Sequence, residues 1–354
     1  MKRIWIDVLT PKQARLFGAI YHKLKKMGYD AIVTARNYDY TAQVLQKLEI
    51  NFIIVGGYAD DLKGKLIEEA KRTIELLNLL NDFDALLAFP NPVAARIAFG
   101  LKRPYIAFTD SPHSEAPSRL ALPLATAVIS SSCIPKGEIE RYIIRDRAVV
   151  MQFHGVDEVE WLKDASINTY ELKNIGVEPF NYIVIRPPEI KASYYTYGVA
   201  NTILDFILKL AECAVKRNYK VVYLPRYRDD PLIKRFANEK NIIIPWEGVE
   251  GTTLVYYAKF VISGGGTMAR EAALIGTPGI SLFPGELYVN KCVAEWGFPL
   301  IQTNDPEKLN NIVERLFNMR EDELNEIKTK AMELLKKLEA PSSTLNQVLA
   351  KVLE

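Results

Sequence analysis

The chain has 354 residues, of which 49% are hydrophobic and 25% are charged, and its formal net charge is +2. This length exceeds what one hydrophobic core usually serves, so we expect two domains. The near balance of charge gives no reason to expect a nucleic-acid partner. No apolar run approaches the roughly 20 residues of a membrane-spanning helix. Residues 1–7 reach an aspartate after three apolar residues, unlike a signal peptide, so we expect a cytoplasmic protein.

The first half of the chain alternates short apolar runs with segments of helical periodicity. Runs that are apolar throughout are typical of strands that helices cover on both faces. The alternation predicts a parallel, doubly wound α/β sheet, whose ligands bind beyond the carboxyl ends of the strands. The expected strands are residues 4–8, 31–34, 52–55, 85–89, 105–108, 127–130 and 149–153.

A second α/β series begins at Tyr182, after a charged and irregular stretch over residues 155–180. We expect an N-terminal Rossmann-like domain of residues 1–165, joined by a C-terminal helix at 341–354, and a C-terminal Rossmann-like domain of residues 166–340. The remainder after residue 283 is predicted to be helical. The second series consists of strands at 182–186, 220–224, 242–244, 260–263 and 279–283, with a helix at 199–216.

A glycine-rich turn lies between the strand at 260–263 and the helix that follows it. Glycines let the backbone approach an anion closely, and the N–H groups and dipole at the start of the helix favour negative charge. The simpler alternative is a tight connection between strand and helix. The predicted anion-binding residues are Ser263, Gly264, Gly265, Gly266 and Thr267.

Two glutamates extend this prediction. Glu271, one turn further along the helix, is placed to accept the hydroxyls of a ribose. The pattern Gly264-x-Gly266-x-x-Ala269, with Glu286 about 20 residues further on, also matches a degenerate dinucleotide fingerprint. That fingerprint normally occupies the first βα unit of its domain, whereas several units of this domain precede it, so NAD is disfavoured.

Polar residues follow the carboxyl ends of several other predicted strands. Arg186 and Arg226 are predicted to pair with diphosphate oxygens, and Arg36 is a weaker candidate of the same kind. Lys12 is predicted to contact a phosphate or an acceptor. For each of these residues the alternative is a solvated side chain at a strand end. Tyr194, Tyr195 and Tyr197 are candidates to stack on a base or sugar.

The loop after the strand at 105–108 concentrates ionisable groups where an α/β sheet places its site. His113 titrates near neutral pH, and Asp110 or Glu115 becomes a base if burial raises its pKa. Asn91 and Arg119 are further candidates. The alternative is a polar surface loop.

Residues 262–280 and 283–286 resemble the nucleotide-sugar motif of GT-B enzymes, which include the peptidoglycan N-acetylglucosaminyltransferase and the UDP-N-acetylglucosamine 2-epimerases. The resemblance implies a GT-B-like fold, with two Rossmann-like domains and a cleft between them. It also implies that the glycine turn binds a diphosphate and that Glu271 holds the ribose. As a whole, the chain resembles an uncharacterised, mainly archaeal family of this superfamily.

The stretch His113-Ser114-Glu115-Ala116-x-x-Arg119 is similar to an epimerase motif in which the glutamate is catalytic, although Pro117 replaces a glycine. An epimerase of that family has further acids in the regions that here read 89–92 and 120–124, where no carboxylate occurs. We therefore favour a glycosyltransferase, which needs one base for the acceptor hydroxyl. The alternatives are a 2-epimerase-like enzyme and a non-catalytic module that binds nucleotide sugars.

The sequence contains neither an Asp-x-Asp motif nor a histidine-rich spacing that would hold a metal ion. We expect a metal-independent reaction with no cofactor beyond the nucleotide sugar itself. The predicted partners are this donor and an acceptor such as a glycan or a lipid-linked sugar.

Overall fold

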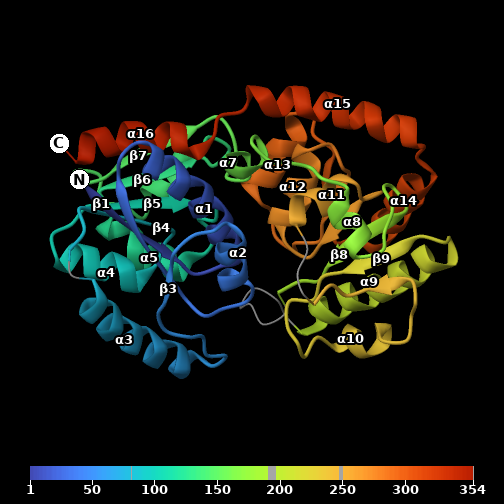
Figure 1. Ribbon diagram of the computed structural model, residues 1–354, viewed down its shortest axis with the longest axis horizontal. Coiled ribbons are helices and arrows are strands. Elements are labelled where there is room, and N and C mark those ends of the chain that lie inside the picture. Colours follow the sequence, from blue (N-terminus) through green and yellow to red (C-terminus); the bar gives the residue numbers. More distant parts are fainter. Residues whose placement is uncertain (81, 190–196, 247–249, 354) are drawn as a thin grey trace. The chain divides into compact units, whose positions relative to one another are not determined.

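The computed structural model describes residues 1–80, 82–189, 197–246 and 250–353 of the chain, which divides into two compact units (Figure 1). Unit 1 comprises Met1–Trp161 and Leu338–Glu354, and unit 2 comprises Leu162–Lys337. Each unit is built around a parallel sheet of its own.

Unit 1 contains a seven-stranded parallel sheet in the order β3-β2-β1-β4-β5-β6-β7. The strand order reverses between β1 and β4, which pair in parallel. In open α/β sheets such a reversal opens a crevice at the carboxyl ends of the two strands. The strands are β1 (Arg3–Val8), β2 (Asp30–Ala35), β3 (Ile53–Ile54), β4 (Ala85–Ala88), β5 (Tyr105–Thr109), β6 (Ala127–Ser131) and β7 (Val149–Phe153).

The helices of unit 1 begin close to these carboxyl ends. The Thr10 side chain accepts a hydrogen bond from the Gln13 amide, with Pro11 at the first helical position, and these two signals start α1. The helices are α1 (Pro11–Lys26), α2 (Thr41–Lys47), α3 (Leu62–Leu79), α4 (Pro92–Gly100), α5 (Glu115–Ala121), η1 (Leu122–Leu124), α6 (Lys136–Glu140), α7 (Val159–Leu162, which reaches the boundary of unit 2) and α16 (Pro341–Val352).

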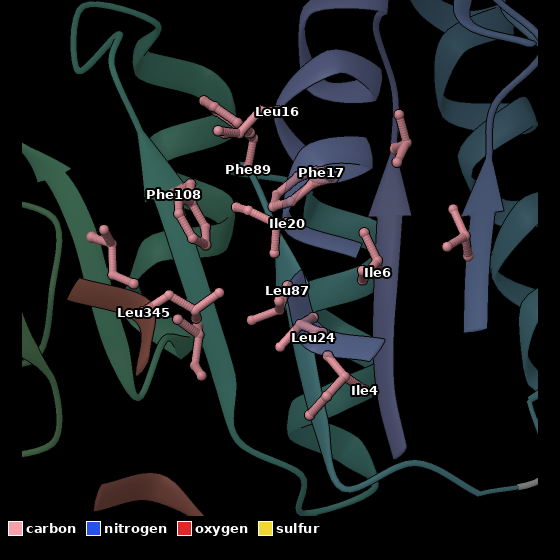
Figure 2. Close-up of a cluster of buried hydrophobic side chains, with 14 of the residues drawn as sticks. Ile4, Ile6, Leu16, Phe17, Ile20, Leu24, Leu87, Phe89, Phe108 and Leu345 are labelled. Carbon is pink, nitrogen blue, oxygen red and sulfur yellow. The ribbon is translucent and has the colours of Figure 1, made fainter. Parts of the chain in front are cut away.

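The core of unit 1 lies between α1 and the sheet (Figure 2). The Phe17 ring lies edge-on to Phe108, with 5.4 Å between the centroids, and to Phe89, with 5.8 Å. Leu345 and Val348 bring α16 into the same core, where this helix packs against β6 and β7. This packing fixes the strands whose carboxyl ends carry the polar loops.

Unit 2 repeats the same topology with a six-stranded parallel sheet in the order β10-β9-β8-β11-β12-β13. Here the strand order reverses between β8 and β11. The strands are β8 (Tyr182–Arg186), β9 (Lys220–Tyr223), β10 (Ile242–Ile243), β11 (Val261–Ser263), β12 (Gly279–Ser281) and β13 (Leu300–Gln302). The helices are α8 (Tyr170–Asn174), α9 (Tyr197–Lys216), α10 (Pro231–Phe236), α11 (Gly251–Tyr256), α12 (Gly266–Leu274), α13 (Tyr288–Glu295), α14 (Pro306–Asn318) and α15 (Glu321–Lys337).

The predicted α/β series is confirmed in both units, with two corrections. β13 was expected to be part of a helical remainder, but its three residues pair with β12 and complete the sheet. The charged stretch over residues 155–180 was expected to be irregular, but it contains the short helices α7 and α8, and three of its acids, Asp157, Glu158 and Glu160, are buried. In the described part of the chain, no helix combines the length and apolar character that crossing a membrane requires.

Candidate functional site

The glycine turn of unit 2 lies at the point where its strand order reverses. It follows β11, and the adjacent β8 ends at Arg186, whose carbonyl oxygen accepts a 2.9 Å hydrogen bond from the Gly264 amide. Arg186 and Ser263 are register partners on the two strands. The turn thus occupies the place where this class of sheet binds ligands.

At two of the glycines an added Cβ atom would overlap a neighbouring residue. A Cβ atom at Gly264 would overlap the backbone of Pro188, in the loop after β8. A Cβ atom at Gly266 would overlap the guanidinium of Arg270. Gly265 is the N-cap of α12 and offers no side chain to the first N–H groups of that helix. These groups therefore keep their capacity to bind an anion.

Arg226, from the loop after β9, is fixed beside this turn. Its Nε donates a 2.9 Å hydrogen bond to the Pro187 carbonyl, and its Nη1 lies 3.4 Å from a carboxylate oxygen of Glu189. Its Nη2 would lie 3.5 Å from a Cβ atom at Gly265. The guanidinium therefore adds positive charge next to the uncapped start of α12.

Arg270, which sequence reasoning did not single out, places a second guanidinium next to Gly266 of the turn. Its side chain is buried and donates a 2.8 Å hydrogen bond to Asn290, whose amide in turn donates 2.8 Å to Gln302. The spacing of four residues from Gly266 puts Arg270 on the same face of α12. This spacing is the feature of the sequence that could have identified Arg270 as a residue of the site.

The other residues predicted for unit 2 lie in different environments. The Ser263 hydroxyl accepts a 3.3 Å hydrogen bond from the Gly265 amide, and Thr267 is half-buried in the first turn of α12. Glu271 is buried on the same helix. Glu286 is exposed, 3.5 Å from Lys291, and no contact with the turn is seen for it. Tyr194 and Tyr195 lie outside the described residues, as does the side chain of Tyr197.

In unit 1, Lys12 connects two carboxylates that lie far apart in the sequence. Its ammonium group, at the start of α1, pairs with Asp110 after β5 and lies 2.7 Å from Asp157, in the loop after β7. It also lies 5.1 Å from the centre of the Phe89 ring. The carboxyl ends of three strands thus build one charged cluster, which we call the Lys12 cluster and which comprises Lys12, Asp110 and Asp157.

Asp157 is the member that sequence reasoning missed. Burial raises the pKa of its carboxyl from the usual 3.8 to about 6, while Lys12 acts against this shift and Asp110 and Glu158 add to it. The two aspartates share one ammonium group, so the cluster holds an excess negative charge when both are ionised. This arrangement favours the uptake of a proton. The position of Asp157 just beyond a predicted strand was the signal for it.

The other ionisable residues of the loop after β5 are more exposed. Partial burial lowers the pKa of the His113 imidazole, while the nearby Asp110 carboxylate opposes that shift. Glu115 pairs with Arg119 at 2.6 Å, four residues along α5, and both side chains are mostly exposed at 60% and 70%. The structure therefore brings Asp110 into the Lys12 cluster but places Glu115 and Arg119 in a surface ion pair.

Asn91 belongs to a buried structural network. It caps α4 by accepting from the Ala94 amide, and its side-chain amide donates to Asp7. Asp7 also accepts from both terminal nitrogens of Arg72, at 3.0 and 2.6 Å. Every one of these side chains is almost fully buried, so the network stabilises the carboxyl ends of β1 and β4. Among the described residues, no group of three or more His, Cys, Asp or Glu side chains could hold a metal ion.

Two parallel sheets, each with its strand order reversed beside its first strand, define a GT-B-like fold, and solved structures with this fold match almost the whole chain. The S. aureus MnaA–UDP co-structure superposes with a TM-score of 0.74 at 14% identity, covering 100% of this chain and 98% of that one. The UDP-GlcNAc 2-epimerase from Methanocaldococcus jannaschii gives 0.64 at 17% identity and 99% coverage of both. The spinosyn forosaminyltransferase SpnP gives 0.60 at 12% identity and 100% coverage of both.

The chain belongs to the family described as "Protein of unknown function (DUF354)", whose model matches residues 2–339. A relative, "Uncharacterized protein MJ0665" from Methanocaldococcus jannaschii, is 30% identical over 320 residues, which cover 88% of this chain and 90% of the relative. The predicted resemblance to an archaeal family with this fold is therefore confirmed.

Proposed function

We propose that the protein binds a nucleoside-diphosphate sugar at the glycine turn of unit 2 and transfers the sugar to a hydroxyl acceptor. The observation that carries this proposal is the uncapped start of α12, with Arg226 beside it and Arg270 behind it. Helix N–H groups and guanidinium forks are the donors that suit phosphate oxygens. MnaA, which has the same fold, was solved with UDP.

The binding residues have distinct roles in this proposal. The backbone of residues 263–267 and Arg226 hold the diphosphate, while Arg186, at the end of the neighbouring strand, contributes further positive charge. Glu271 holds the ribose hydroxyls. Arg270 is a positioning residue, since its buried guanidinium packs against Gly266.

The Lys12 cluster supplies the proton acceptor. Asp110 takes the proton from the acceptor hydroxyl, whose oxygen then forms the new bond to the anomeric carbon. The bond from that carbon to the diphosphate oxygen breaks, and the nucleoside diphosphate leaves with the electron pair. Positive charge at the glycine turn stabilises this leaving group. Asp157 shares Lys12 with Asp110 and so adjusts the charge of the base.

Donor binding can be tested before any acceptor is known. UDP, GDP and their sugars are titrated while the melting temperature is followed, with uridine and guanosine as matched ligands that lack phosphate. We expect stabilisation by the diphosphates alone, and its loss in Glu271→Ala and Arg226→Gln. Arg235→Gln, an exposed arginine in the same unit, is the control. If no diphosphate stabilises the wild-type protein, the proposal is wrong.

Epimerisation is the second candidate, because the Lys12 cluster holds a second carboxyl group, Asp157, beside Asp110. Incubation of the bound UDP-sugar in D₂O distinguishes the two reactions. Deuterium at C2 of the sugar would identify an epimerase, whereas transfer releases the nucleoside diphosphate only when an acceptor is present and leaves C2 unlabelled. Binding without either reaction would identify a non-catalytic module.

A further inference from the structure

Two cationic side chains, Arg36 and Lys65, lie near the β3 edge of the unit 1 sheet. Arg36 directly follows β2, where its amide donates a 2.9 Å hydrogen bond to the last carbonyl of β1. Lys65 is in the first turn of α3, which follows β3. Arg36 thus lies at the carboxyl end of a strand, as ligand-binding groups of such sheets do, and Lys65 lies in the helix that follows the neighbouring strand.

Two tyrosines hold these cations in place. The Arg36 guanidinium lies 5.0 Å from the Tyr38 ring centre and 5.4 Å from that of Tyr58, and the two rings are 4.8 Å apart. The Lys65 ammonium lies 5.2 Å from the Tyr58 centre. A hydrogen bond from the Asn37 amide to the Gly56 carbonyl ties the loops after β2 and β3 together. The cations are therefore positioned by stacking.

Neither cation has an anionic partner. Within the described ranges, no carboxylate lies in ion-pair distance of Arg36 or Lys65, in contrast to Arg72 and Lys12 of the same unit. The Arg36 Nε is buried without a hydrogen-bond partner, and the guanidinium donates only a long 3.4 Å bond to the Leu9 carbonyl. Desolvation also lowers the pKa of Arg36.

A buried donor without a partner is rare in a native fold and calls for a ligand, an ion or a water molecule. A guanidinium presents several donors in a rigid fork that suits the oxygens of a phosphate or carboxylate. A bound oxyanion would satisfy Nε and add negative charge beside the Tyr58 ring, which both cations contact.

We infer that Arg36, Lys65, Tyr38 and Tyr58 form a binding site for an oxyanion carried by the acceptor, so that the acceptor is a phosphate- or carboxylate-bearing hydroxyl compound. The identification of the ligand as the acceptor rests on the proposed function. The oxyanion site itself is inferred from the contacts of Arg36 and Lys65 alone. The site is distinct from the glycine turn, which belongs to unit 2. The loop at Leu9 and Thr10 connects it to Lys12, so it lies on the side of β1 away from Asp110.

Three sugars with the same ring test this site by titration calorimetry, with UDP present at saturation. They are glucose 6-phosphate, glucuronate and uncharged glucose. We expect one or both of the charged sugars to bind and glucose not to bind, and the preferred anion identifies the source of the oxygens. Arg36→Gln and Lys65→Gln should weaken that binding at least about tenfold, which is the effect of losing a charge-assisted hydrogen bond.

Controls separate this outcome from the proposed function. Arg103→Gln, an exposed arginine of the same unit, should bind like the wild type. Should Arg36→Gln fail to fold, Arg36→Lys keeps the charge but removes the buried Nε donor, and it should bind more weakly. Equal binding in wild type and both Arg36 and Lys65 variants would overturn the inference. Anion binding that disappears in Arg226→Gln instead would place the anion at the glycine turn, and failure of UDP to bind would overturn the proposed function alone.

Discussion

The two units place different chemistry at the carboxyl ends of their strands. In unit 2 the strand ends around the reversal carry glycines and arginines, so positive charge gathers at an open backbone. In unit 1 the segments after β1, β5 and β7 carry Lys12 between two aspartates, so negative charge is in excess within the Lys12 cluster. Since the sheets share their topology, the difference lies entirely in the loops. The difference underlies our proposal that unit 2 binds an anionic leaving group and that unit 1 accepts a proton.

The largest effect is expected at Gly264. Gly264→Ala forces a Cβ atom into the backbone of Pro188 and should lower the unfolding free energy by about 1–3 kcal/mol, the usual cost of overpacking, with loss of UDP binding. Urea denaturation and calorimetry measure both quantities.

Gly265→Ala is the matched variant, since an added Cβ atom there has room and ordinary backbone angles. It should keep the stability of the wild type but weaken UDP binding, because the methyl group covers the approach to the helix N–H groups. A Gly264→Ala protein as stable as the wild type would contradict the close packing that we describe.

Arg226→Gln is expected to have the next largest effect. Loss of a charge-assisted contact costs about 1.5–3 kcal/mol, so the dissociation constant of UDP should rise roughly 10- to 100-fold. The stability should change little, because within the described ranges the guanidinium is bonded to a loop carbonyl and to Glu189. Arg235→Gln is the control, and a change of less than about twofold in Arg226→Gln would remove this residue from the site.

Asp157→Asn tests the Lys12 cluster of unit 1 through the pH dependence of the unfolding free energy. The pKa of Asp157 is raised in the folded state, so the folded protein holds this proton more tightly than the unfolded chain does. The unfolding free energy of the wild type should therefore fall as pH rises from about 4 to about 6, by on the order of 2 kcal/mol. The variant should lack this decrease, whereas Asp146→Asn, an exposed control, should retain it. Parallel pH profiles for all three proteins would show that Asp157 does not titrate in this range.

The smallest effect is expected for Glu115→Gln. Exposed ion pairs such as Glu115–Arg119 contribute about 0–1 kcal/mol, so stability and the transfer rate should stay close to those of the wild type. Asp110→Asn should abolish transfer. The reverse result, with Glu115 essential and Asp110 dispensable, would favour the epimerase-like role of Glu115 and break the proposed division between the units.

Hydrophobic periodicity was sufficient to predict both sheets, because strands buried on both faces must be apolar throughout. It failed at β13, where the apolar run consists of Leu300 and Ile301 alone and is shorter than the runs that marked the other strands. The glycine turn could be located from the sequence because its residues are consecutive along the chain. Arg226 was predicted from its place at a strand end, but its distance from Gly265 depends on how the loop after β9 packs against the loop after β8.

The sequence by itself therefore determined the α/β architecture and located the glycine turn, because both depend on residues that are neighbours along the chain. Only the tertiary structure decided which ionisable groups meet. Asp157 is 145 residues from Lys12, and the packing of three strand ends brings the two together. Arg270 and Arg36 are similar cases. Tertiary packing buries the Arg270 guanidinium next to the glycine turn, and it buries the Arg36 Nε without a hydrogen-bond partner. Long-range packing sets burial and charge pairing, and these in turn set the chemistry of a side chain.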